Sequence, residues 1–283
     1  MKAGGFSSRI RDGAFALAAF LLLVFAGPPC SAAGKAIRVV GSTTMGPMVR
    51  EMVVAYQAAH PDLHFSLTGS GSASGAAALA SGAADVALLS RGMSRQETVS
   101  CVRNGIAPQR FVLALDGLAP IVHPDNPVAD LSLRQLRAIY SGGLVNWRGL
   151  GGPDLAVEPL ARSADSGTRD IWLDVVMART PEMGAVERVD SNAAMVRAVR
   201  ARPGAIGYVG MGFVDETVRA VRLEGAEATP ASVLEDSYPA ARTLNVYIGK
   251  ESAPEVRAFA EFVLGNACRP IIERAGFIPA PHP

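Results

Sequence analysis

Three loops rich in serine, threonine and glycine carry the residues of this sequence that could do chemistry. They are 41–47 (GSTTMGP), 69–75 (GSGSASG) and 162–169 (RSADSGTR), and each stands where a helical pattern begins. The unpaired N–H groups and the positive dipole end of a helix favour an anion there, and hydroxyl groups add further donors. One such loop is more often a turn with an N-cap. Three of them, with Arg162 four residues before Ser166, favour an oxyanion site.

The sequence gives little support for catalysis or for a metal. Of its four histidines, His64 alternates with apolar residues on a predicted strand, and His60 and His123 stand beside prolines in predicted turns, so none is expected to bind a metal. The segment 71–75 (GSASG) resembles a nucleophile elbow, but its central residue is Ala73. We therefore expect no catalytic residue, metal or cofactor. The alternative is an exported phosphate-ester hydrolase, with Asp165 as a base beside Ser166.

Strands and helices that alternate along the chain must position these loops. Apolar or alternating runs predict strands at 37–40, 63–67, 86–89, 111–115, 205–209 and 244–248. Apolar residues at helical spacing predict helices between several of them, and Ser132 with Gln135 predicts a capping box at the start of one. The alternation predicts an α/β fold with largely parallel sheets. The length predicts two lobes, and the lack of a flexible boundary between them predicts more than one crossing.

The N-terminal segment has the layout of a secretory signal peptide. Three basic residues precede an apolar run at 14–26, and small residues follow up to Ala33. The run has 13 residues, whereas a membrane-spanning helix needs about 20. We therefore expect export after cleavage at Ala33. The prolines before Cys30 disfavour the alternative, a lipid anchor on that cysteine.

Charge and cysteine content restrict the partners. The formal net charge is +1, from 27 basic and 26 acidic residues, so a nucleic-acid partner or a charged membrane surface is not expected. Cys101 and Cys268 remain after the predicted cleavage. The sequence leaves open whether these two pair in an oxidising compartment.

The order of segments resembles the phosphate-binding subunit of bacterial phosphate ABC importers, among the type II periplasmic binding proteins. The matching stretches include GSTTMGPMVREM, GSGSASGAAALASGAADVALLSR, RSADSGTRDIW and PGAIGYVGMGFVDE, and they span nearly the whole mature chain. The resemblance implies a two-lobed α/β fold with a central ligand cleft. The expected parts are the signal peptide at 1–33, lobe 1 at 34–117 and 213–283, and lobe 2 at 118–212.

The resemblance also implies a function and a set of ligand contacts. It implies a periplasmic protein, expected to be a monomer, that captures inorganic phosphate and delivers it to a membrane ABC permease. The implied ligand contacts, position by position, are Thr43, Thr44, Ser72, Ser90, Arg91, Arg162, Ser166, Gly167 and Thr168.

One departure from the family bears on ligand choice. Some members carry an aspartate at the position that matches Ser90-Arg91, where a carboxylate accepts the proton that phosphate retains. Arg91 offers only donors, so Asp165 is the nearest candidate for this acceptor role. Sulfate, molybdate or a similar oxyanion therefore stays open as the alternative ligand.

Overall fold

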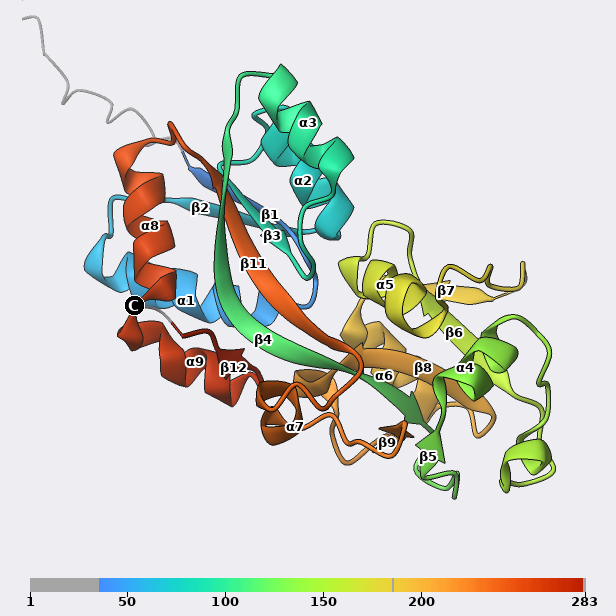
Figure 1. Ribbon diagram of the computed structural model, residues 1–283. Helices are drawn as coiled ribbons and strands as arrows, with labels where there is room; N and C mark the ends of the chain where they lie inside the picture. Colours follow the sequence, from blue (N-terminus) through green and yellow to red (C-terminus); the bar gives the residue numbers. More distant parts are fainter. Residues whose placement is uncertain (1–35, 185, 282–283) are drawn as a thin grey trace, which may run out of the picture. The chain divides into compact units, whose positions relative to one another are not determined.

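The computed structural model describes residues 36–184 and 186–281. The predicted signal peptide and Cys30 lie outside the described residues. These described residues form one compact unit of mixed α/β structure (Figure 1). No helix within the described ranges is long and apolar enough to cross a membrane.

The first lobe begins with three parallel strands. Strand β1 (Ile37–Gly41) lies between β2 (Phe65–Gly69) and β3 (Val86–Leu89). Helices α1 (Gly46–Ala59), α2 (Ser72–Ala80) and α3 (Arg95–Arg103) follow the strands in turn. Because the carboxyl ends of parallel strands meet at one edge of a sheet, the loops that follow β1, β2 and β3 lie together at that edge.

Strand β3 shows why this layer is stable. All four of its residues are buried, since its alternate side chains enter different clusters. Val86 and Leu88 pack with the helix α1, and with α8 (Pro254–Leu264) on the same side. Ala87 and Leu89 pack with α2 on the other. A continuous apolar run is what a strand covered on both faces requires.

Two long strands connect the lobes. Strand β4 (Pro108–Val122) pairs with β11 (Ala241–Gly249) through residues 108–117 and with β8 (Ala205–Gly210) through residues 118–122. All these pairings are antiparallel, as is that between β11 and β3. The prediction of largely parallel sheets is therefore wrong for the middle of the sheet, because the crossing strands run against their neighbours.

The second lobe repeats the strand–helix alternation. Strand β6 (Glu158–Arg162) lies parallel to β8 and to β7 (Glu187–Val189). Its helices are α4 (Leu133–Tyr140), α5 (Gly167–Ile171), which continues as a π-helical turn, and α6 (Asn192–Arg200). The predicted capping box of Ser132 and Gln135 at the start of α4 is confirmed.

The remaining elements are short. They are β5 (Asp130–Leu131), β9 (Arg219–Ala220), β10 (Arg222–Leu223), α7 (Pro230–Leu234), α9 (Arg269–Arg274) and β12 (Ile278–Pro279). Segment 218–240 packs with the second lobe, because Val221, Leu223, Val233 and Tyr238 belong to its apolar core.

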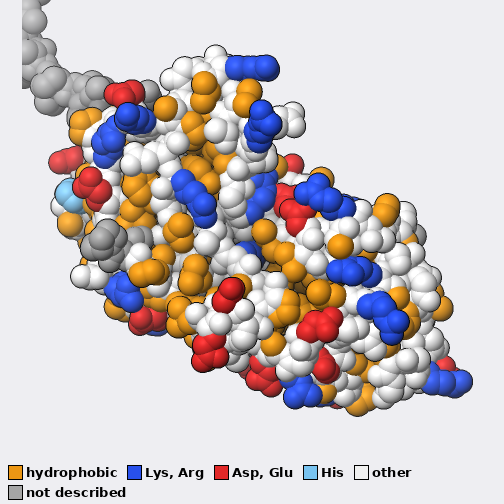
Figure 2. All heavy atoms as spheres, viewed as in Figure 1, with side chains coloured by type: hydrophobic (Ala, Val, Ile, Leu, Met, Phe, Trp, Pro, Cys, Tyr) orange, Lys and Arg blue, Asp and Glu red, His pale blue; other side chains and the backbone are white. Residues whose placement is uncertain are grey.

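The structure also shows the state of the two cysteines and the distribution of charge on one face of the surface. Cys101 and Cys268 are both buried and both free. On the face drawn in Figure 2, Lys and Arg are interspersed with Asp and Glu, as the near-neutral composition leads one to expect.

Candidate functional site

Arg162 is a buried cation that forms no ion pair with a described residue. It ends β6, and the residue is 1% exposed. Its guanidinium donates to neutral oxygens: Nη2 to Thr43 Oγ1 and to the carbonyl of Asp190, both at 2.9 Å, and Nη1 to Asn192 Oδ1 at 3.2 Å. No carboxylate of the described residues lies within 4.0 Å of it. Burial, together with the charge of Arg242, lowers the pKa of Arg162 to about 10, although Tyr208 and the charge of Asp190 raise it in part, so the group stays protonated at neutral pH.

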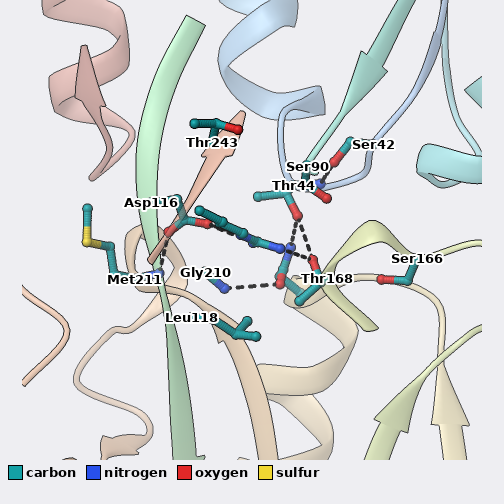
Figure 3. A network of polar contacts seen from close by, with 12 residues as sticks. Ser42, Thr44, Ser90, Asp116, Leu118, Ser166, Thr168, Gly210, Met211 and Thr243 are labelled. Atoms are coloured by element: carbon teal, nitrogen blue, oxygen red, sulfur yellow. Dashed lines mark hydrogen bonds and ion pairs between the residues drawn. The ribbon is translucent and has the colours of Figure 1, made fainter. Parts of the chain in front are cut away.

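Two threonine hydroxyls meet next to Asn192, which Arg162 also contacts; Figure 3 shows the two threonines, Thr44 and Thr168. Thr44, from the loop after β1, lies with its Oγ1 3.2 Å from Thr168 Oγ1 in α5. Asn192 Nδ2 donates to Thr44 Oγ1 at 2.9 Å, and Arg242 Nη1 donates to Thr168 Oγ1 at 2.9 Å. Each oxygen accepts an N–H, and only one hydroxyl hydrogen can serve the bond between them. At least one hydroxyl hydrogen therefore remains for a ligand.

Two serines and a glycine form a second group. Ser72 begins α2, and its Oγ accepts from the backbone N–H of Ser90 at 3.0 Å and lies 3.3 Å from Ser90 Oγ. Gly167, the first residue of α5, lies against both: a Cβ at this position would be 2.3 Å from Ser72 Oγ. The starts of α2 and α5 therefore approach each other, which brings their free N–H groups to one region.

The hydroxyls of the predicted loops do not all serve the same purpose. Ser166 is the N-cap of α5, because its Oγ accepts from Arg169 N at 3.3 Å. In contrast, α1 begins without a side-chain cap. The hydroxyls of Thr43 and Thr44 instead bond to Arg162 and Asn192 of the second lobe. The hydroxyls of the first loop therefore do not cap α1 but connect the two lobes.

Two of the residues expected at the site have other partners in the structure. Arg91 bonds to both oxygens of Glu97, at 2.7 and 2.8 Å, and to Asp170 Oδ2 at 2.5 Å. Asp165 Oδ2 accepts from Ser74 Oγ at 3.0 Å in an exposed position. We call the hydroxyls of Thr43, Thr44, Ser72, Ser90 and Thr168 the hydroxyl cluster. Arg91 and Asp165 do not bond to this cluster: Arg91 is held by two carboxylates and Asp165 by the hydroxyl of Ser74.

Sequence reasoning missed three residues at this site: Asn192, Asp116 and Arg242. Asn192 follows the N-cap Ser191 at the start of α6, where an asparagine looks like an ordinary helix-start residue. Arg242 and Asp116 lie on β11 and β4 and form an ion pair with a 2.7 Å separation, with side chains 1% and 0% exposed. Their pairing joins positions 126 residues apart. The one available sequence signal was a charged residue beside each predicted apolar run.

Comparison with known proteins identifies the family to which the chain belongs. Residues 27–267 match the family model described as a PBP superfamily domain. The chain is a member of the PBP superfamily. Among the relatives of this superfamily protein, the phosphate-binding protein PstS of Pseudomonas aeruginosa is 28% identical over 86% of this chain and 82% of the relative. Protein SphX of Synechococcus elongatus is 26% identical over 85% and 76%, respectively.

Solved structures agree with the fold. The crystal structure of a putative phosphate ABC transporter substrate-binding protein from Clostridium perfringens, with bound phosphate, is 30% identical with a TM-score of 0.81. The match covers 87% of this chain and 100% of that one. An ABC-type phosphate transport receptor from Vibrio cholerae is 29% identical with a TM-score of 0.71, over 86% and 100%. The two-lobed fold with a cleft is therefore confirmed for this superfamily protein.

Proposed function

We propose that this protein captures inorganic phosphate between its two lobes and delivers it to a membrane ABC permease. The observation that carries the proposal is Arg162, a buried guanidinium whose partners are all neutral. Burying an unpaired charge is costly, so the arrangement favours an anion that completes its coordination. Nearby donors, namely the hydroxyls of Thr43, Thr44, Ser72 and Thr168 and the N-terminus of α5, suit an oxyanion with several acceptor oxygens.

Relatives support phosphate as that oxyanion. PstS of Pseudomonas aeruginosa is a phosphate-binding protein, and the Clostridium perfringens structure contains phosphate. Because those relatives are binding proteins for transport, we propose capture without catalysis. The proposed ligand contacts are Thr43, Thr44, Ser72, Arg162, Ser166, Gly167 and Thr168, with Ser90 through its hydroxyl.

Export and partnership follow from the same proposal. The leader at 1–33 fits secretion, and a phosphate carrier of this fold acts outside the cytoplasmic membrane, where it meets the permease. Closure around the ligand is favoured because the proposed donors lie on both lobes, and a ligand shifts a conformational equilibrium by its differential contacts.

Equilibrium dialysis of the mature chain with labelled phosphate tests the proposal. We expect one phosphate retained per chain, displaced by unlabelled phosphate but not by equal sulfate or molybdate. Displacement by sulfate or molybdate would mean that the site takes another oxyanion. No retention at all would contradict the proposal. Turnover of a chromogenic phosphate ester would show that the protein is an enzyme and not only a binding protein.

A further inference from the structure

Arg91 links the two lobes outside the hydroxyl cluster. It lies on the loop after β3 of the first lobe, next to Ser90. Its Nε donates to Asp170 Oδ2 at 2.5 Å, and Asp170 belongs to α5 of the second lobe. Because the partners lie on different lobes, this ion pair forms only when the lobes are together.

Glu97 fixes the arginine on its own side. Both carboxylate oxygens accept from Arg91, at 2.8 Å from Nη1 and 2.7 Å from Nη2. Glu97 also completes the capping box of α3, since Ser94 N donates to it at 2.7 Å. A bidentate contact to a carboxylate on a capped helix sets the direction of the guanidinium. With Nη1 and Nη2 bonded to Glu97, the remaining guanidinium nitrogen, Nε, donates to Asp170.

Both ends of the pair are attached to proposed phosphate ligands. Arg91 follows Ser90 directly, and Asp170 lies in α5 three residues after Gly167 and two after Thr168. The pair therefore sets the approach of the Ser72–Ser90 group to the start of α5. It does so without a bond to the site itself.

The pair is open to solvent on one side. A surface pocket of about 790 Å³ is lined by Arg91, Gly92 and Ser94 from the first lobe and by residues of segment 169–188 from the second. The side chain of Arg91 is 12% exposed and that of Asp170 is 32% exposed. Partial exposure makes the pair sensitive to salt and lets it break when the lobes separate.

We propose that Arg91 and Asp170 are positioning residues that hold the closed form of the phosphate site; the inference rests on the proposed function. The pair contributes only in the closed form, so it adds to the free energy that favours closure. Its loss leaves every phosphate contact in place but lets the lobes open more readily. The expected effect is therefore faster release of phosphate, with a similar association rate.

Asp170→Asn and Glu97→Gln form a matched pair of variants. Each removes one negative charge beside Arg91, but only Asp170 lies across the cleft. We expect Asp170→Asn to weaken phosphate binding about 3- to 20-fold, between the effects of exposed and buried pairs, with the change in the dissociation rate. Glu97→Gln keeps the capping contact but loses one of the two bonds that orient Arg91, so it should weaken phosphate binding less than Asp170→Asn does.

Two further variants distinguish positioning from a general loss of stability. In the double variant Arg91→Met with Asp170→Asn, phosphate affinity should equal that of the weaker-binding single variant, because the Arg91–Asp170 contact is lost in both single variants. Asp154→Asn, which breaks the exposed Arg148–Asp154 pair within the second lobe, should leave phosphate release unchanged. Equal effects of Asp170→Asn and Glu97→Gln, or additive effects in the double variant, would overturn the inference.

Small-angle scattering separates this inference from the proposed function. If the wild-type chain binds no phosphate, the proposed function fails, but the radius of gyration without phosphate still tests the pair. We expect a larger radius for Asp170→Asn than for the wild type and for Glu97→Gln. An unchanged radius together with an unchanged phosphate release rate refutes a positioning role.

Discussion

Asn192 shows how one amide organises the proposed anion site at the scale of a residue. It is fully buried, and its two ends serve different groups. Oδ1 accepts from Arg162 Nη1 and from the backbone of Gly210, and Nδ2 donates to Thr44 Oγ1. An aspartate of the same shape could not donate to Thr44, and a leucine could satisfy neither side. The site thus depends on a residue that need not touch the ligand.

Replacement of Asn192 by alanine should therefore affect both stability and binding. We expect the free energy of unfolding to fall by about 1–3 kcal/mol, because buried donors lose their partners. Phosphate affinity should fall roughly tenfold, the loss of one hydrogen bond to a charged group. Urea unfolding and calorimetric titration measure the two quantities.

Asn104→Ala is the matched control for that variant. The side chain of Asn104, on the first lobe, donates from Nδ2 to the carbonyl of Ala80 at 2.8 Å. The control should lower stability and leave phosphate affinity unchanged. Equal affinity losses in the two variants would contradict a specific role for Asn192.

Helix α5 brings the second lobe to the site at the scale of an element. Its first residue, Gly167, allows a close approach to Ser72 and Ser90 that a Cβ would prevent. Its third and fourth residues form ion pairs, Arg169 with Glu182 and Asp170 with Arg91. The short helix is therefore held from two sides while its N-terminus faces the first lobe.

Gly167→Ala tests whether this approach matters for binding. A Cβ would lie 2.3 Å from Ser72 Oγ and 2.8 Å from Ser90 Oγ, so the two serines or the lobes that carry them must shift to accept it. We expect phosphate binding weaker by about 1–3 kcal/mol, the usual cost of overpacking. Gly149→Ala is the control, because nothing lies within 4 Å of a Cβ there. Unchanged affinity in Gly167→Ala would show that the approach is not part of the bound form.

Elements were predictable from the sequence where the pattern is local. The strands at 37–41 and 86–89 and the capping box at Ser132 follow from apolar runs and cap spacing. The partners of Arg91 were not predictable, because Asp170 lies 79 residues away and comes close only through the packing of two lobes. A resemblance supplied the positions of the proposed ligands, but not which of their side chains already had partners.

Asp116 ties the crossing segments together at the scale of the whole molecule. It lies on β4 at the junction of the two lobes, pairs with Arg242 of β11, and accepts from the backbone of Met211 after β8 at 3.0 Å. Arg242 in turn reaches Thr168 of α5. The order of apolar runs could not reveal this junction.

Breaking that junction should destabilise the whole fold. Asp116→Asn leaves Arg242 buried without its counter-charge, so we expect a loss of about 3–5 kcal/mol in the free energy of unfolding. The double variant Asp116→Asn with Arg242→Met removes both charges and should recover part of that loss. Urea unfolding of the three chains measures this. If Asp116→Asn is as stable as the wild type, the Asp116–Arg242 pair does not stabilise the junction between the lobes.

Calorimetric titration of the wild-type chain and of Arg162→Met with phosphate tests the central claim most directly. Methionine keeps an apolar stem of similar length and removes the unpaired buried cation. We predict one-to-one binding in the wild type and a loss of roughly 2–5 kcal/mol in the variant, the effect of removing a buried charged partner. Equal phosphate affinity in the two chains, or no binding by the wild type, would contradict the assignment of this cleft to an anion.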